Sequence, residues 1–199
     1  MEEEKLVQSG MATLCAASAE GVQGVEQRYW YIAIVKNSTE KVCAQRLQDQ
    51  GYECYVPYQT EEHIWKDGRR KQVDRILLRS VVLLHVTPQE RLQAIKNPFI
   101  FGFMVNRAAQ PDKFGRYPVA TIPERQIEHL RFMLYHSTQS VEIDATIRKG
   151  DKVRVCRGDL LGMEGIVKYD PNGKPRFCIS LDILGYATVE IDGRDVEKI

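Results

Sequence analysis

Residues 147–169 read IRKGDKVRVCRGDLLGMEGIVKY and are the most informative stretch of the chain. Apolar and polar residues alternate over 151–155, which is typical of a strand with one buried face. Three glycines follow within the eight residues 158–165, and glycine reaches the positive φ of tight turns and bulges without a Cβ clash. A second apolar run begins at Ile166. The stretch therefore predicts two strands joined by a tight connection, at the start of a small β-barrel.

The residues after this stretch continue the pattern, because turn signals at 171–173 and 184–185 separate short apolar runs. We therefore expect a C-terminal domain over residues 149–199, a barrel of about five strands. The expected strands are 152–156, 163–169, 176–181, 186–191 and 196–199. Residues 137–148 are mostly polar and lack a helical period, so they predict a linker in front of this domain.

Upstream of the linker, residues 28–136 mix strand and helix patterns and predict an α+β domain, an antiparallel sheet with flanking helices. The run RYWYIAIV at 28–35 is nearly all apolar or aromatic, as a central strand is. The next segment predicts a helix that is capped by Ser38 or Thr39 and ends at Gly51. The apolar stripe expected for this helix is Val42, Cys43 and Leu47.

The second half of this domain starts with a basic hairpin, whose turn we expect at residues 66–68 because Asp-Gly favours hairpin turns. The run ILLRSVVLLHV at 76–86 predicts one long buried strand. The remaining expected elements are a helix at 89–96, a strand at 99–105, an edge segment at 118–122 and a helix that begins at Pro123.

Charge is unevenly distributed over the 199 residues, whose net charge is +1. Residues 1–27 hold five Glu and one Lys, lack aromatic residues and predict a disordered tail. Residues 28–136 hold 17 Lys and Arg against 11 Asp and Glu. The middle of the chain is therefore the part that could lie near phosphates, although such an excess also occurs on ordinary solvated surfaces.

Several classes of protein are disfavoured by the composition. The five cysteines are widely spaced and form no C-x-x-C pair, so neither a zinc site nor a redox motif is expected. No apolar run approaches the ~20 residues of a membrane span. The sequence has no P-loop, nucleophile elbow or histidine pair at metal-ligand spacing. We expect a cytoplasmic, non-enzymatic, monomeric protein without metal or cofactor.

The order of these elements resembles the NusG family of transcription elongation factors, which consist of an NGN domain followed by a KOW domain. The resemblance covers residues 29–199. The segment 30–51, WYIAIVKNSTEKVCAQRLQDQG, is similar to the opening strand and helix of the RfaH branch, and 150–167 is similar to the KOW motif. The tail and the short KOW domain also resemble the UpxY regulators of capsular-polysaccharide operons.

The family resemblance implies that the NGN domain binds the clamp helices of RNA polymerase and suppresses pausing or termination. The matching positions for an apolar docking patch are Ile34, Leu78, Val81 and Leu83. Alternation places Val81 and Leu83 on one face of their strand and the residues between them on the other. The resemblance favours the first pair as the docking face, and a core role is the alternative. The family usually has Phe-Pro-Gly/Asn-Tyr at 78–81, where this chain has Leu-Arg-Ser-Val.

Contact with non-template DNA is a second property that the resemblance implies. The matching positions are Lys36 and Arg46, and Lys41 is nearby. Arg69, Arg70 and Lys71 at the hairpin tip are further basic candidates. Cationic side chains there could pair with phosphates, and a solvated surface is the alternative. The KOW domain is expected to recruit ribosomal protein uS10 or the termination factor Rho. A general RNA- or ribosome-binding KOW module without polymerase activity is the alternative function.

Overall fold

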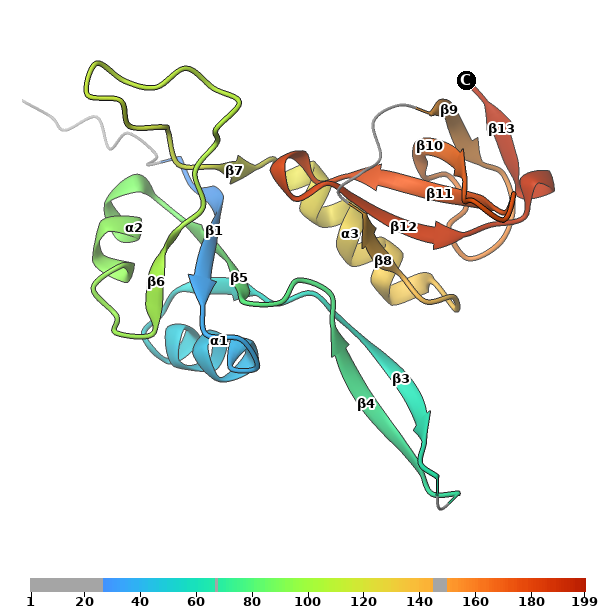
Figure 1. The fold of residues 1–199 in the computed structure, drawn as a ribbon, viewed down its shortest axis with the longest axis horizontal. Helices are drawn as coiled ribbons and strands as arrows, with labels where there is room; N and C mark the ends of the chain where they lie inside the picture. Colours follow the sequence, from blue (N-terminus) through green and yellow to red (C-terminus); the bar gives the residue numbers. More distant parts are fainter. Residues whose placement is uncertain (1–26, 67, 145–149) are drawn as a thin grey trace, which may run out of the picture.

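The computed structural model describes residues 27–66, 68–144 and 150–199, and nearly all of the predicted tail lies outside this part. Figure 1 shows an N-terminal sheet with helices on it, a long protruding hairpin and a C-terminal sheet on the far side of a connecting helix. The strands within each sheet are antiparallel, as predicted. The mixed α+β character of the N-terminal part is therefore confirmed.

The N-terminal sheet is built around β1 (Tyr29–Val35), which pairs with β5 (Val81–Val86), β6 (Ile100–Phe103) and β7 (Thr121–Ile122). β2 (Glu53–Tyr55) extends the sheet beyond β5. A central position explains the almost wholly apolar sequence of β1, since both of its faces are covered.

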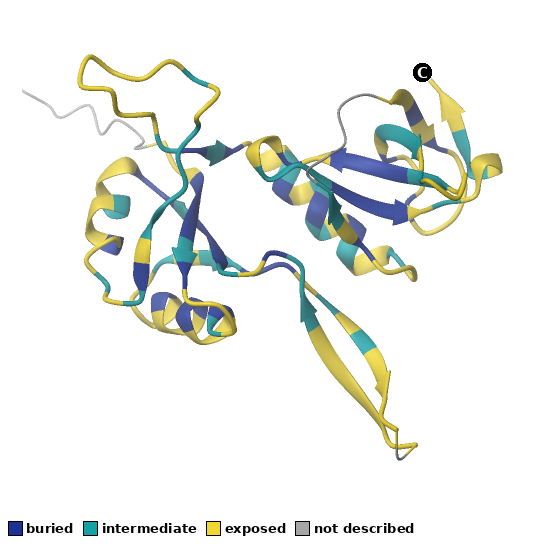
Figure 2. Cartoon of the chain, viewed as in Figure 1, coloured by how far each residue is buried: buried dark blue, intermediate teal, exposed yellow. Residues whose placement is uncertain are grey.

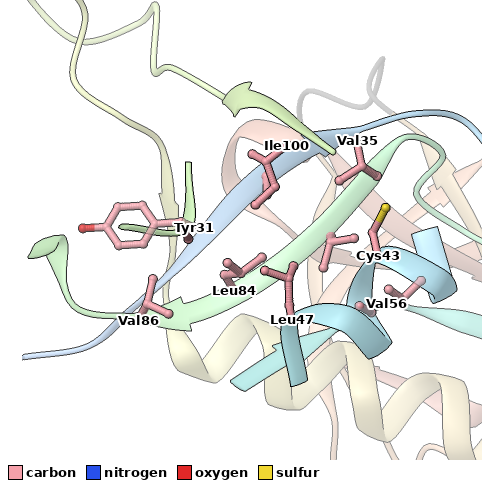
Figure 3. Packing of buried hydrophobic residues seen from close by; sticks show 12 residues of the cluster. Tyr31, Val35, Cys43, Leu47, Val56, Leu84, Val86 and Ile100 are labelled. Carbon is pink, nitrogen blue, oxygen red and sulfur yellow. The ribbon is translucent and has the colours of Figure 1, made fainter. Parts of the chain in front are cut away.

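One face of this sheet is covered by α1 (Glu40–Asp49) and α2 (Pro88–Ala94). Figure 3 shows Leu47 and Cys43 of α1 directed at Leu84 and Val35 of the sheet. The predicted apolar stripe of α1 is only partly right, because Val42 is exposed and Ala44 is buried in its place. Thr39 is the N-cap residue, but its hydroxyl donates to the carbonyl of Lys36 and makes no capping bond.

The long strand predicted over 76–86 is wrong. Ile76 ends β4 (Arg70–Ile76), which pairs with β3 (Tyr58–Ile64) in the protruding hairpin, and β5 begins only at Val81. Ser80 breaks the extended backbone with a φ of 61°, a left-handed conformation that a strand interior does not contain.

The C-terminal part contains every strand that the sequence predicted, with bounds shifted by one or two residues. The six-stranded sheet has the order β13-β9-β10-β11-β12-β8. Its strands are β8 (Glu142–Asp144), β9 (Asp151–Val155), β10 (Glu164–Tyr169), β11 (Pro175–Ser180), β12 (Tyr186–Glu190) and β13 (Val196–Lys198). Short 3-10 turns, η1 (Asp182–Leu184) and η2 (Gly193–Asp195), connect the last three strands of the chain.

Two expectations for this part of the chain are modified by the structure. The pairing among the described residues leaves β13 and β8 as open edges, so no closed barrel is found. Residues 142–144, expected in the linker, form β8 and pair with β12, while 145–149 lie outside the described residues. The glycines of the opening stretch behave as expected, since Gly158 and Gly162 have φ values of 83° and 84°.

The helix α3 (Glu124–His136) connects the two sheets and begins immediately after Pro123, as predicted. Its buried side chains divide between them: Ile127 belongs to the cluster on the N-terminal sheet, whereas Leu130 and Met133 pack with the C-terminal sheet. In Figure 2 this helix carries a dark buried stripe between the two sheets. Both sheets are therefore held on one helix.

Candidate docking face and nucleic-acid contacts

The residues of the predicted docking patch lie on the face of the N-terminal sheet that α1 and α2 leave free. In the β1–β5 register, Ile32 is opposite Leu83 and Ile34 is opposite Val81. Directly paired residues of antiparallel strands point to the same face. Val82 and Leu84 point to the other face and belong to the core beneath α1. The separation of the two pairs that alternation predicted is therefore confirmed.

This face, which we call the α3 face, is covered in the structure. Its buried members are Trp30, Ile32, Leu78, Val81, Leu83, Ala120, Ile122 and Ile127. Ile143 of β8 and Leu184 of η1 pack against the same cluster, although they follow β5 by about sixty and a hundred residues in the chain. Leu83 is fully buried, and Leu78 and Val81 are each 7% exposed.

The N-terminal end of α3 is fastened to this face by polar contacts around Trp30. The indole Nε1 of Trp30 donates a hydrogen bond to the Glu124 carboxylate. The His85 ring stacks on Trp30 with centroids 4.8 Å apart, and its Nε2 lies 3.7 Å from Glu124 Oε2. These contacts fix the position of the helix that covers the docking face. Sequence reasoning missed these contacts, because only the strand register brings Trp30 and His85 together.

Further along α3, Arg131 lies over two aromatic rings, 5.0 Å from the centroid of Trp30 and 4.8 Å from that of Tyr55. Burial raises the pKa of Tyr55 to about 12, although the Arg131 charge works in the opposite direction. Tyr55 therefore remains a neutral phenol at neutral pH. It packs against both the α3 face and the C-terminal core, so it belongs to the junction between the sheets.

The C-terminal sheet contacts the N-terminal part directly through η1. Gln126 of α3 donates from its Nε2 to Asp182 Oδ1 at 3.0 Å. Ile183 lines a small open groove together with Ile34 and Phe103. Ile34 is the one predicted docking residue that is partly exposed, so the groove marks the open end of the α3 face.

The linker is tied to the base of the hairpin. The Gln59 side chain donates to the Gln139 carbonyl at 2.9 Å and accepts from the Val141 N–H at 2.9 Å. Arg75 donates to Ser140 Oγ at 2.6 Å and to the Val141 carbonyl at 2.8 Å. Residues 139–141 are thus held by β3 and β4, which adds a third fastening between the two halves of the chain.

The cations predicted near α1 differ in their surroundings. Lys41 forms an ion pair of 2.5 Å with Asp74 of the hairpin and lies 3.8 Å from the centre of the Tyr58 ring. The hydrogen bond from Lys41 is the main cause that holds the pKa of Asp74 below its ordinary value. Lys36 and Arg46 are exposed, and the Arg46 guanidinium lies 5.9 Å from the Phe99 ring. Lys36 and Arg46 are therefore more accessible to phosphates than Lys41.

The hairpin tip gathers the other predicted cations near aromatic side chains. Lys71 is opposite His63 in the register, and the N–H of Trp65 donates to the carbonyl of Arg69. The Trp65 side chain is exposed and makes an edge-on contact with His63, with centroids 5.0 Å apart. Arg70 lies 3.6 Å from Glu62. The sequence showed the cations without interleaved aromatic residues, because the turn brings 63–65 beside 69–71 only after pairing.

A family model described as "Transcription termination factor nusG" matches residues 28–131, half of the chain, over the sheet, the hairpin and most of α3. The chain belongs to the NusG family. It is accordingly a transcription elongation factor in the general sense, from a family of non-enzymatic factors. The predicted family is confirmed, whereas the UpxY subtype stays a prediction.

Two solved structures align with most of this chain at low sequence identity. One, titled "Domain interaction in Thermotoga maritima NusG", is 14% identical with a TM-score of 0.48, and the match covers 87% of this chain and 98% of that chain. Another, the MjSpt4:Spt5 complex in conformation A, is 16% identical with a TM-score of 0.28, over 85% and 97% of the two chains. No curated protein matches the sequence.

The described residues contain neither a candidate membrane-spanning helix nor a candidate metal site. No helix there is both long and apolar enough to cross a bilayer. Within the same part of the chain, no three His, Cys, Asp or Glu side chains are grouped as a metal site requires.

Proposed function

We propose that the α3 face docks on an apolar helical surface of RNA polymerase, the clamp helices, and that the protein thereby suppresses pausing or termination, at specific operons. The supporting observation is an apolar sheet face that is covered in part by distant segments of the same chain, through Ile143 and Leu184. A core face is normally covered by its own domain. A few aliphatic side chains are enough for a transient interface, since burial contributes about 25 cal/mol per Å².

In this arrangement the docking residues are covered, so binding requires the C-terminal sheet to move away from the α3 face. The contacts that must open include those of Ile143 and Leu184 with the cluster, the Gln126–Asp182 hydrogen bond and the hydrogen bonds of residues 139–141. The helix α3 must also leave one of the two sheets, because Ile127 is buried on the N-terminal sheet and Leu130 and Met133 on the C-terminal sheet. A ligand shifts such an equilibrium by its preference for one state. Polymerase would therefore hold the protein in the open state.

The two halves of the chain have separate roles in this proposal. Residues 28–136 act as the NGN domain that binds polymerase, with Lys36, Arg46 and the hairpin tip available to nearby non-template DNA. Residues 149–199 act as a KOW module that recruits a second partner once released, ribosomal protein uS10 or Rho.

A pull-down with core RNA polymerase tests the docking face. Ile34→Glu should reduce retention, because it places a charge at the open end of the face, and Leu184→Asp should increase retention by releasing the cover. Val42→Glu is the matched control, since Val42 is exposed on α1, on the opposite side of the sheet. Equal retention of the parent, Ile34→Glu and Leu184→Asp would contradict the proposal. Binding of RNA or ribosomes without any polymerase would favour the alternative KOW-module function.

A further inference from the structure

The loop between β6 and β7 is a closed, exposed projection of the N-terminal domain. Val105 and Val119 form an isolated β-bridge at its base, and the N–H of Asn106 donates to the Pro118 carbonyl at 2.8 Å. Nearly every residue over 107–117 is exposed. Figure 2 shows this loop as a long yellow excursion beside β7. We call residues 107–117 the β6–β7 loop.

The tip of this loop has a defined conformation that Asp112 organises. Its Oδ1 accepts the N–H groups of Phe114 and Arg116 at 2.8 and 2.9 Å, and its Oδ2 accepts Arg116 Nε at 3.1 Å. The N–H of Arg116 is the main cause that holds the pKa of Asp112 below its ordinary value. Gly115 completes the turn with a φ of 76°. The residues at the tip are therefore held in place before any ligand arrives, which lowers the entropic cost of binding.

This tip presents an aromatic ring between cations. Phe114 is 68% exposed, and the Lys113 ammonium and Arg116 guanidinium each lie 5.1 Å from the centre of its ring. Tyr117 is also exposed, and Arg107 adds a third cation to the loop, against the single carboxylate of Asp112. Phe114 thus contributes little to the core of the fold, and the loop combines positive charge with an exposed aromatic ring.

We propose that the β6–β7 loop binds single-stranded nucleic acid, with a base stacked on Phe114 and phosphates paired with Lys113 and Arg116. Bases are free to stack on a side chain only where they are unpaired. Within a duplex only the terminal base pairs could stack on the Phe114 ring. The cations supply the sequence-independent attraction to the backbone. An acidic peptide would also suit the cations, but the ring favours a ligand with planar bases.

This site differs from the predicted nucleic-acid contacts on α1 and the hairpin. In Figure 1 the loop and the hairpin tip project from opposite ends of the N-terminal domain. The loop is exposed in the closed arrangement of the two sheets, so it needs no polymerase and no opening to bind. The proposal adds a contact to the proposed function, and either of the two can fail alone.

Fluorescence anisotropy with the full chain tests the loop. The probes are labelled single strands of about 12 nucleotides, within the site sizes of such binders, as DNA and as RNA of the same sequence, together with the DNA duplex. Base–aromatic stacking of about 1–3 kcal/mol predicts that Phe114→Ala weakens single-strand binding about 5- to 160-fold. The same variant should leave duplex binding unchanged. Phe114→Trp keeps an aromatic ring and should bind single strands as the parent does. The DNA and RNA probes distinguish the two sources of single strand.

Two further variants make the result specific. Tyr169→Ala removes an equally exposed aromatic side chain from β10 and should have no effect. Lys113→Gln should reduce the slope of log K against log salt concentration by about 0.7, the contribution of one phosphate contact on a single strand.

Three outcomes would overturn the proposal: equal affinity of Phe114→Ala and the parent, no preference of the parent for single strands over the duplex, or loss of binding in Trp65→Ala but not in Phe114→Ala. The last would assign the binding to the hairpin tip. Competition of an acidic peptide at the same affinity as the oligonucleotide would also overturn it.

Discussion

The two faces of the N-terminal sheet have similar apolar compositions but different kinds of cover. The α1 face, with Leu84 and Val35, is covered by helices that lie next to these strands in the sequence. The α3 face, with Leu83 and Val81, is covered by α3 and by side chains from the C-terminal sheet. The first cover forms with the domain itself. The second depends partly on contacts across the junction with the C-terminal sheet.

Under the proposed function, this difference separates a permanently covered face from one that polymerase binding uncovers. Burial alone does not distinguish them, since Leu83 and Leu84 are both fully buried. The two residues differ in which segments cover them: α1 and α2 cover the face of Leu84, whereas α3 and the C-terminal sheet cover that of Leu83.

Leu84→Ala should lower the free energy of unfolding by about 2–5 kcal/mol, because it removes buried methyl groups and leaves a cavity in a local core. Urea denaturation followed by tryptophan fluorescence measures the loss. The same substitution at Leu92, which is 55% exposed on α2, is the control and should have almost no effect. A small loss at Leu84 would mean that the α1 face is not the permanent core.

Glu40 holds the α1 face closed at its polar edge. The side chain is 1% exposed, and its Oε1 accepts the N–H of Ser80 at 2.7 Å and that of Ser38 at 3.2 Å. Glu40→Ala should cost about 1–3 kcal/mol, since the N–H groups of Ser80 and Ser38 then lose an acceptor in a partly buried position. Glu40→Gln keeps an acceptor oxygen and should cost less, in the same urea titration. Equal losses in both variants would assign the effect to charge.

Most elements of both sheets could be predicted from the sequence, because alternation and helical spacing are local signals. The strands after residue 150 and the start of α3 are examples. Alternation also separated Val81 and Leu83 from their neighbours. The segments that cover these two residues could not be predicted, since part of the cover comes from Ile143 and Leu184, about sixty and a hundred residues further along the chain.

The other features that sequence reasoning missed depend on contacts between distant segments or on a single backbone dihedral angle. Lys41 reads as a free cation, but only the folded hairpin brings Asp74 and Tyr58 to it. The run 76–86 has the pattern of one strand. The positive φ of Ser80 could not be predicted, because serine, unlike glycine, does not favour that conformation. Val42 was expected inside from helical spacing, yet the sheet covers only the Cys43 and Leu47 side of the helix.

A double-mutant cycle sharpens the comparison of the faces. Leu184→Ala removes a half-buried cover residue, and we expect it to couple with Leu83→Ala by about 1 kcal/mol, as residues of one cluster do. Leu184→Ala and Leu84→Ala should be additive, because their side chains lie in different clusters. Hydrogen exchange should show faster exchange at the C-terminal sheet junction in Leu184→Ala while α1 keeps its protection. Coupling of Leu184 with Leu84 would contradict the separation of the two faces.

Ser80→Gly should give the smallest change, and in the opposite direction. A non-glycine residue in the left-handed region costs about 1–2 kcal/mol, and part of this gain is offset by the greater backbone entropy of glycine in the unfolded chain. We expect a net stabilisation of about 0.5 kcal/mol in urea, from relief at the φ of 61°. The turn precedes β5, whose side chains point to both faces, so Ser80→Gly should stabilise the sheet without changing the coupling between Leu83 and Leu184.

Gly102→Ala is the control, in which glycine is replaced instead of introduced. A Cβ at Gly102 meets no atom within 4 Å and the backbone there needs no glycine, so the substitution introduces no strain. A change in the Leu83–Leu184 coupling in Ser80→Gly would mean that the turn, and not the C-terminal cover, determines how the α3 face is closed.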